Sequence, residues 1–351
     1  MSSALSGFRP RHFARAASFF PTARVVFAAG ALLLAPVGPA AVWAKKIAPP
    51  PAAPKDGRSA GRWPFAATSP WNTPLGADAQ LAPESAACSQ TFRDAASLSD
   101  INAAEWSHPI YFASKSDPLV RVYLYGEVKA TLRIPRSAEP ARPHGKDTDG
   151  HLHIIDPTER FVDELYRARR RADGHLTAEA YSRNDLRSSG VGQGGVRAYG
   201  GSAIAGLIRS GELASGIRHV LALALPRRVQ RTGPVWPATT EDDFAASDYR
   251  GSVPMGQLVA LPRDLDAGAL NLGREGKVLL RVLQDYGAYD VDSAADFDLY
   301  AEPAAERELG SARADWAKLR PFLRCVTNNR SDAAGGPGAR VAPSAPPLPP
   351  Q

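Results

Sequence analysis

Hydrophobic and polar residues alternate along much of the chain, which is the pattern of strands with one buried face. Residues 120–134 (VRVYLYGEVKATLRI) predict two strands that meet at Gly126, where a glycine marks a turn or bulge. The same alternation predicts shorter strands over residues 151–155, 161–166, 217–225, 257–261 and 297–300. Strands therefore account for most of the predicted structure.

Helical periodicity is confined to three short segments, residues 202–213, 275–286 and 315–323. The second segment places four apolar residues on one face before Gly287, namely Val278, Leu279, Val282 and Leu283. Many short strands with a few inserted helices predict a mainly β fold of the β-sandwich or jelly-roll kind.

The first 44 residues have the pattern of a signal peptide. Four arginines precede an apolar run over residues 25–35, and Val42 and Ala44 are placed for cleavage before Lys45. That run is too short to cross a membrane, and no later apolar run is long enough. We therefore expect a secreted or periplasmic protein that is peripheral to a membrane at most.

Composition predicts where the folded part begins and ends. Residues 45–60 are rich in Pro, Ala and charge, as flexible linkers are, and residues 331–351 form a Pro-rich tail expected to be disordered. The segment between them, residues 61–330, is long enough for a single β-rich domain.

Net charge gives no sign of nucleic-acid binding. The chain has 42 Lys and Arg against 36 Asp and Glu, and removal of the four leader arginines leaves 38 against 36, a net charge of +2. The one dense basic run, residues 167–171, is typical of a solvated turn or strand end. Nucleic-acid binding requires a concentrated basic surface, so we expect no such partner.

Two cysteines, Cys88 and Cys325, lie near opposite ends of the predicted domain. In an oxidising compartment two cysteines without competitors have one possible pairing. We therefore predict a Cys88–Cys325 disulfide, which would bring the first and last parts of one domain together.

Asp149, His151 and His153 lie within DGHLHIIDP and are the first candidates for chemistry. On a strand, alternation places all three on one face at steps of about 7 Å. A row of ionisable groups is costly to bury, so we expect this face to be either wet or a functional site. Asp149 and His151 are then candidate catalytic groups, and His153 is a candidate substrate contact.

Three interpretations of this row remain open. A carboxylate beside an imidazole can transfer protons near neutral pH. An H-x-H pair with a carboxylate can hold a divalent metal such as zinc, although Pro157 stands where a cupin-like metal motif has an acid. The row can also be a hydrogen-bonded structural feature. The leading hypothesis needs no cofactor, and a metal-dependent jelly-roll enzyme using His151 and His153 is an alternative.

Glycoside hydrolysis needs two carboxylates that face each other. The candidates are Asp149, Glu164, Asp242 and Asp285, and we prefer Asp285 as the partner of Asp149 because tyrosines follow it in LQDYGAYDVD. β-Elimination would instead use His151 with Tyr199, while Arg197 neutralises a uronate carboxylate.

Two further residues complete the set of candidates. His219 shares one face of a predicted strand with three leucines, so it is either a core residue or a catalytic neighbour of the Asp149 row. Trp236 lies between prolines in GPVWPATTEDD, where it could stack on a sugar ring or pack beneath a loop. The six glycines of residues 190–201 lack dinucleotide-binding spacing and indicate a mobile loop or a hairpin connection.

Four segments together resemble a little-characterised family of secreted bacterial proteins thought to act on glycans: SPWNTPLG (Ser69 to Gly76), GLIRSGELASGIRHVLAL (Gly206 to Leu223), VWPAT (Val235 to Thr239) and RVLQDYGAYDVD (Arg281 to Asp292). The resemblance would cover most of residues 63–302. It implies export, a β-rich fold and a glycan as the substrate, and it carries over no catalytic residues.

The leading hypothesis is therefore an exported protein that cleaves a polysaccharide by hydrolysis or β-elimination. A non-catalytic protein that binds a glycan or the cell envelope is the alternative from another class. Paired acids would indicate the enzyme, and exposed aromatic residues without paired acids would indicate the binding protein.

Overall fold

The computed structural model of the chain describes residues 58–93, 97–266 and 268–350. The signal peptide predicted for residues 1–44 and most of the predicted linker lie outside these residues. In the described residues, sixteen strands in four sheets, with a few short helices, confirm the predicted mainly β fold. Across the described part of the chain, no helix combines the length and the apolar character that crossing a bilayer requires.

The largest sheet is six-stranded and mixed. In spatial order it contains β1 (Ser99–Asn102), β15 (Phe297–Tyr300), β10 (Leu221–Pro226), β14 (Ala288–Ala294), β13 (Leu258–Ala260) and β16 (Arg324–Cys325). β1 with β15 and β10 with β14 pair in parallel, and the other pairs are antiparallel. Every residue of the central strand β10 is buried, so the main core surrounds this strand.

Five α-helices and three 3₁₀-helices occur in the described residues: α1 (Ala87–Thr91), α2 (Glu212–Ser215), α3 (Ala245–Asp248), α4 (Arg274–Asp285), α5 (Ala312–Leu319), η1 (Pro70–Asn72), η2 (Pro303–Glu308) and η3 (Arg320–Phe322). α4 matches the predicted helix over 275–286 and buries Leu279, Val282 and Leu283. α5 and η3 divide the third predicted helix, because Pro321 cannot continue an α-helix.

The helix predicted over residues 202–213 is wrong. Only α2, at its end, is helical, and the preceding residues form turns. Gly206 has a φ of +73°, and a Cβ added there would lie 2.5 Å from the backbone nitrogen of Ala222. The segment therefore runs closely against β10, which a regular helix would not allow.

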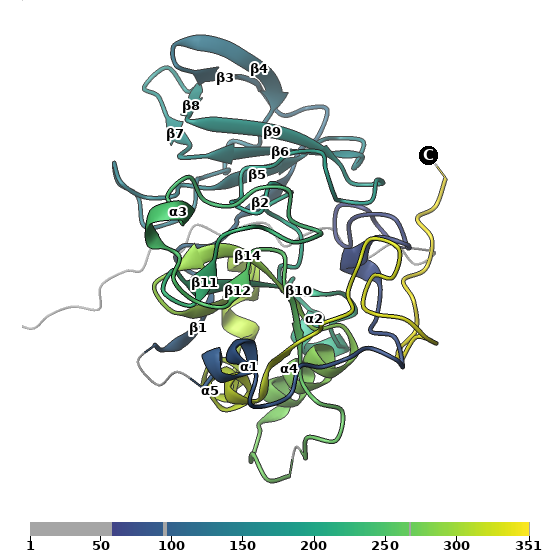
Figure 1. Cartoon of the computed structure of the whole chain (residues 1–351). Helices are drawn as coiled ribbons and strands as arrows, with labels where there is room; N and C mark the ends of the chain where they lie inside the picture. The colour runs from purple at the N-terminus through teal and green to yellow at the C-terminus, as the bar shows by residue number, and fades with distance from the viewer. Residues whose placement is uncertain (1–57, 94–96, 267, 351) are drawn as a thin grey trace, which may run out of the picture. The chain divides into compact units, whose positions relative to one another are not determined.

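Two four-stranded sheets form a sandwich (Figure 1). One contains β2 (Ile110–Phe112), β5 (Leu152–Ile155), β6 (Phe161–Tyr166) and β9 (Ala180–Asp185), and the other contains β4 (Glu127–Arg133), β3 (Leu119–Leu124), β8 (Leu176–Ala178) and β7 (Arg169–Arg170). A second core lies between them and includes Val122, Leu152 and Leu165. A small fourth sheet pairs β11 (Gln230–Arg231) with β12 (Val253–Pro254).

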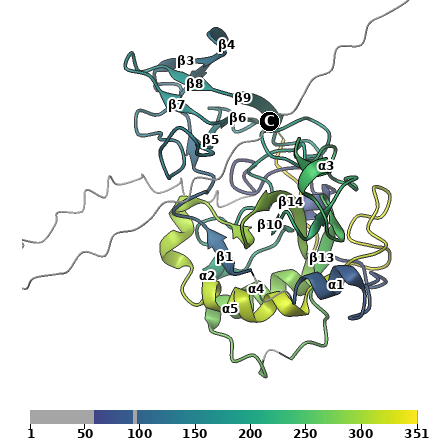
Figure 2. The same cartoon turned by 60° about the vertical axis from the view of Figure 1, so that its left-hand side comes forward.

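The sandwich contains the predicted β3–β4 hairpin, with Gly126 at the turn at a φ of +93°. It differs from an antiparallel jelly roll, because β2 pairs with β5, and β3 with β8, in parallel. Figures 1 and 2 show the β2–β5–β6–β9 sheet on the side of the sandwich nearer to β14. The face of this sheet that looks away from the second core carries the candidate site.

The predicted disulfide is confirmed. Cys88 in α1 is bonded to Cys325 in β16, with their Cα atoms 6.2 Å apart and a sequence separation of 237 positions. The bond fastens the first helix to the edge strand of the largest sheet.

The Pro-rich segment from residue 331 to residue 350, for which we predicted disorder, makes defined contacts with the rest of the domain. The Val341 nitrogen donates to the Leu75 carbonyl at 3.0 Å, and the Tyr286 hydroxyl donates to the Pro343 carbonyl at 3.1 Å. Ala345 is 5% exposed. Val341, Ala342 and Leu348 pack against the main core, and the backbone of the segment has partners in Leu75 and Gly76.

Candidate functional site

Three histidines meet on the face of the β2–β5–β6–β9 sheet that looks away from the second core. Leu152 and Ile154 of β5 point into the second core, so His151 and His153 point to the opposite face. In the parallel pairing of β2 with β5, Ile110 is opposite His153, which places His108 beside His151. The His108 and His151 ring centroids are 4.3 Å apart, and His108 Nδ1 lies 3.0 Å from His153 Nε2.

The sequence interpretation missed His108. It precedes the short strand β2, and only the parallel pairing of β2 with β5 brings it to the H-x-H motif. The three residues are almost completely buried, at 1%, 4% and 0% exposure for His108, His151 and His153. The predicted pair on one strand face is therefore present, but it lies in a buried polar layer rather than in an open hollow.

Arg197 is the cation of this layer. It is 4% exposed, its Nη2 donates to His108 Nε2, and its Cζ lies 4.0 Å from the centroid of the Tyr300 ring. Its Nε lies 3.9 Å from Asp292 Oδ2, and both Nε and Nη1 lack hydrogen-bond partners in the described part of the chain. We predicted Arg197 as a substrate contact, and the structure places it next to His108.

The hydrogen bond from Arg197 determines which nitrogen of His108, and then of His153, carries the proton. A guanidinium only donates, so His108 Nε2 must accept and the His108 proton must be on Nδ1. That proton is donated to His153 Nε2, which leaves the His153 proton on Nδ1. His153 Nδ1 is buried without a partner among the described residues, and so is His151 Nδ1.

Burial keeps these imidazoles neutral. It lowers the pKa of all three rings, and the positive charge of Arg197 lowers them further. For His151 the pKa falls to about 3. The only cation of the layer near neutral pH is therefore the guanidinium, as far as the described residues go.

Three partly exposed carboxylates lie close enough for their charges to interact, and we call Asp149, Asp242 and Asp292 the carboxylate cluster. They come from the loop before β5, the loop after β11 and strand β14. Burial raises the pKa of Asp292 to about 7; Arg197 opposes this shift, and Asp242 and Asp149 add to it. Burial likewise raises the pKa of Asp149. Asp242 accepts a hydrogen bond of 2.6 Å from the Tyr249 hydroxyl.

Backbone hydrogen bonds hold the cluster and Arg197 together. The Tyr199 nitrogen donates to the Val291 carbonyl at 3.1 Å, which fixes Arg197 beside β14. The Thr239 nitrogen donates to the Tyr199 carbonyl at 2.9 Å, which attaches the loop that carries Asp242. Trp236, predicted as a sugar platform, is in the same loop and is partly exposed.

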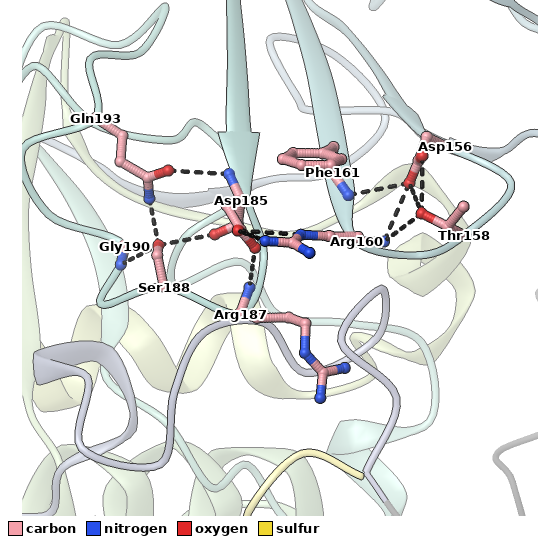
Figure 3. A network of polar contacts seen from close by, with 9 residues as sticks. All are labelled: Asp156, Thr158, Arg160, Phe161, Asp185, Arg187, Ser188, Gly190 and Gln193. Atoms are coloured by element: carbon pink, nitrogen blue, oxygen red, sulfur yellow. Dashed lines mark hydrogen bonds and ion pairs between the residues drawn. The ribbon is translucent and has the colours of Figure 1, made fainter. Parts of the chain in front are cut away.

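The glycine-rich segment that leads to Arg197 is anchored at its beginning (Figure 3). The Asp185 nitrogen donates to Gln193 Oε1 at 3.0 Å, and the Gly190 nitrogen donates to Ser188 Oγ at 3.0 Å. Arg160 Nη2 donates to Asp185 Oδ2 at 3.1 Å, which ties the loop to the β5–β6 turn. These bonds define where the loop leaves β9.

Glu164 has a structural role beside the histidines. It is opposite His153 in the β5–β6 pairing and accepts hydrogen bonds from Ser202 Oγ and the Ala203 nitrogen. Burial raises its pKa to about 7, although these hydrogen bonds oppose the shift. Because its acceptors already have partners, Glu164 holds the turn after Arg197 against β6.

Three predicted site residues make their contacts elsewhere. Tyr199 is 1% exposed and packs edge-on against Trp71, with its hydroxyl 2.9 Å from the Ser202 carbonyl, so it is a core residue. Asp285 pairs with Arg281 one turn earlier on α4. His219 pairs with Glu212 at 3.1 Å and lines a small pocket with Trp63 and Arg209. Asp292, seven residues after Asp285, takes the place we had predicted for Asp285.

The three histidines are also a possible metal site. One ligand atom from each of His108, His151 and His153 lies within 4.8 Å of the others. Imidazole nitrogens suit zinc and neighbouring transition metals. The Arg197 contact opposes an ion, because it keeps the proton of His108 on the nitrogen that faces His153.

No family model matches the chain, and no curated protein or solved structure is significantly similar to it.

Proposed function

We propose that this chain is an exported enzyme that hydrolyses glycosidic bonds of a polysaccharide at the carboxylate cluster. One observation carries the proposal: the buried guanidinium of Arg197 has its Nε 3.9 Å from Oδ2 of Asp292 on β14, and its charge also lowers the pKa of Asp149, in the loop before β5. The charge of Asp242 acts on the pKa of both carboxyl groups. Glycoside hydrolysis needs two carboxyl groups of different protonation beside one bond, and such a cluster can supply them.

Asp292 is the proposed general acid. Its pKa of about 7 leaves a proton on the carboxyl group in a useful fraction of molecules near neutral pH. After it protonates the leaving oxygen, the carboxylate that remains faces Arg197 Nε at 3.9 Å. The guanidinium stabilises this charge, and it is held in place before the reaction begins.

Asp149 is the proposed second carboxylate, which activates water or attacks the sugar directly. It precedes β5 and is partly exposed. Asp242 acts on both carboxyl groups from the loop that also carries Trp236. A partly exposed tryptophan in this loop suits a sugar, because the apolar face of the sugar ring can stack on the indole.

Export and the substrate class are supported by other features. The leader pattern and the Cys88–Cys325 disulfide are both typical of proteins outside the cytoplasm. The four motifs that resemble secreted glycan-active proteins favour a polysaccharide over a small sugar.

The test is incubation of the mature protein with a panel of neutral and uronic polysaccharides. Hydrolysis predicts new reducing ends without ultraviolet absorbance, whereas an unsaturated product would indicate β-elimination and overturn the hydrolytic proposal. Binding without any product would favour the non-catalytic alternative. Asp292→Asn should slow product formation by about 10²–10⁴-fold, and the matched control is Asp243→Asn, an exposed neighbour of the cluster.

A further inference from the structure

We propose that His108, His151 and His153 bind one divalent transition-metal ion of the zinc type, and that Arg197 must leave His108 for the ion to bind. This inference goes beyond the proposed hydrolysis and does not depend on it, because it concerns the buried layer beneath the carboxylate cluster.

The placement of the three rings carries the inference. His151 and His153 project from one face of the chain at β5, and His108 projects from the neighbouring parallel segment. Their ligand atoms lie within 4.8 Å of one another. The 3.0 Å between His108 Nδ1 and His153 Nε2 is close to the separation of about 3.3 Å that two nitrogens have when each lies about 2.0 Å from one tetrahedral ion.

A buried nitrogen of His151 supports it independently. The Nδ1 atom of His151 has no hydrogen-bond partner within the described ranges of the chain. Buried polar atoms are almost always partnered, so this nitrogen indicates a missing neighbour. An ion bound to it would supply that neighbour, while His153 would bind through Nε2 and keep its proton on Nδ1.

Arg197 sets the condition for binding. While it donates to His108 Nε2, the proton on His108 Nδ1 occupies the space between His108 and His153 that a shared ion needs. If the guanidinium turns towards Asp292, 3.9 Å from its Nε, the proton can move to Nε2 and Nδ1 becomes a ligand. Arg197 and the ion therefore compete, through both charge and the tautomer of His108.

The surroundings can accept the extra charge. Asp149 and Asp292 lie near Arg197 and can offer negative charge to both the ion and the displaced guanidinium. Three neutral nitrogens leave a fourth position for water or for one of these carboxylates, which is the arrangement of an open zinc site.

The test is a metal titration of the full mature chain, from which a chelator has first removed any bound metal. Co²⁺ is added and its binding is followed by visible absorption. Zn²⁺ is then added to displace the bound Co²⁺. One equivalent should give the absorption of a four-coordinate, nitrogen-ligated ion. His153→Val should weaken binding by more than about 100-fold, beyond the effect of losing an outer contact. Arg197→Met should bind at least about tenfold more tightly, because it removes a nearby positive charge.

His144→Gln is the matched control, since His144 is exposed in a loop, and it should bind as the wild type does. Circular dichroism of His153→Val establishes that the variant is folded. Absence of stoichiometric binding in both the wild type and Arg197→Met would overturn the inference, as would binding that His153→Val leaves unchanged. Polysaccharide cleavage does not enter the readout, so the two proposals fail separately.

Discussion

The Nε atom of Arg197 lies 3.9 Å from Oδ2 of Asp292, while Nη2 of the same guanidinium donates to His108. One buried cation thus connects the exposed carboxylates with the histidine layer. Any change at Arg197 should alter the proton affinity of Asp292.

We expect the pH dependence of cleavage to show this connection. The proposed acid must be protonated, so the rate should fall as the pH rises through the Asp292 pKa of about 7. The positive charge of Arg197 lowers this pKa, so Arg197→Met should move the alkaline midpoint upward. The control Arg171→Met, at an exposed pair with Asp173, should leave the midpoint in place. A midpoint that is unchanged or lower in Arg197→Met would contradict the assignment.

Trp236 should contribute to substrate binding rather than to the chemical step. Trp236→Ala removes the proposed stacking surface and should raise KM by roughly 5- to 150-fold, equivalent to about 1–3 kcal/mol, with a smaller change in kcat. Trp236→Phe keeps an aromatic face and should restore most of the affinity. Steady-state kinetics on a soluble polysaccharide distinguish the two parameters, and a loss confined to kcat would rule out a platform.

The ion pair of His219 with Glu212 should contribute to stability in a way that depends on pH. Burial opposes the charged ring, but the Glu212 carboxylate outweighs this effect and the pKa of His219 is raised. The contribution is therefore complete at low pH and is lost as the pH rises through the folded-state pKa. His219→Gln should lower the free energy of unfolding by about 1.5–3 kcal/mol at pH 6 and by less at pH 9. Urea titrations at both pH values check this, and equal losses would refute it.

The disulfide should account for a large part of the stability. Replacing both Cys88 and Cys325 by serine should lower the free energy of unfolding by roughly 3–5 kcal/mol, because the bond closes a very long loop in the unfolded chain. Thermal unfolding of the oxidised wild type and the double variant measures the difference. Two freely alkylatable thiols in the native protein would show that the bond does not form.

Local pattern was sufficient for those parts of the fold that depend on neighbouring residues. The β3–β4 hairpin, β6, β15 and α4 follow from alternation, from one helical stripe and from glycines at turns. The disulfide followed from the absence of other cysteines. The helix predicted over residues 202–213 was wrong because Gly206 packs closely against β10, and hydrophobic periodicity does not reveal such a contact.

The candidate site was only partly visible in the sequence. The alternation of His151 and His153 placed them on one face, and Arg197 was predicted to neutralise a carboxylate of the substrate. The position of His108 in the site depends on the parallel pairing of β2 with β5. The position of Asp292 depends on strand β14, which follows α4. Such pairing joins distant segments, so a single sequence cannot give it.

The central claim is that Asp292 donates a proton to a glycosidic oxygen. The most direct measurement compares the rates at which the wild type, Asp292→Asn and Asp243→Asn release reducing ends from a polysaccharide that the wild type cleaves. Loss of the acid should slow Asp292→Asn by about 10²–10⁴-fold, while Asp243→Asn should keep the wild-type rate. Equal rates for the three folded proteins would contradict the account.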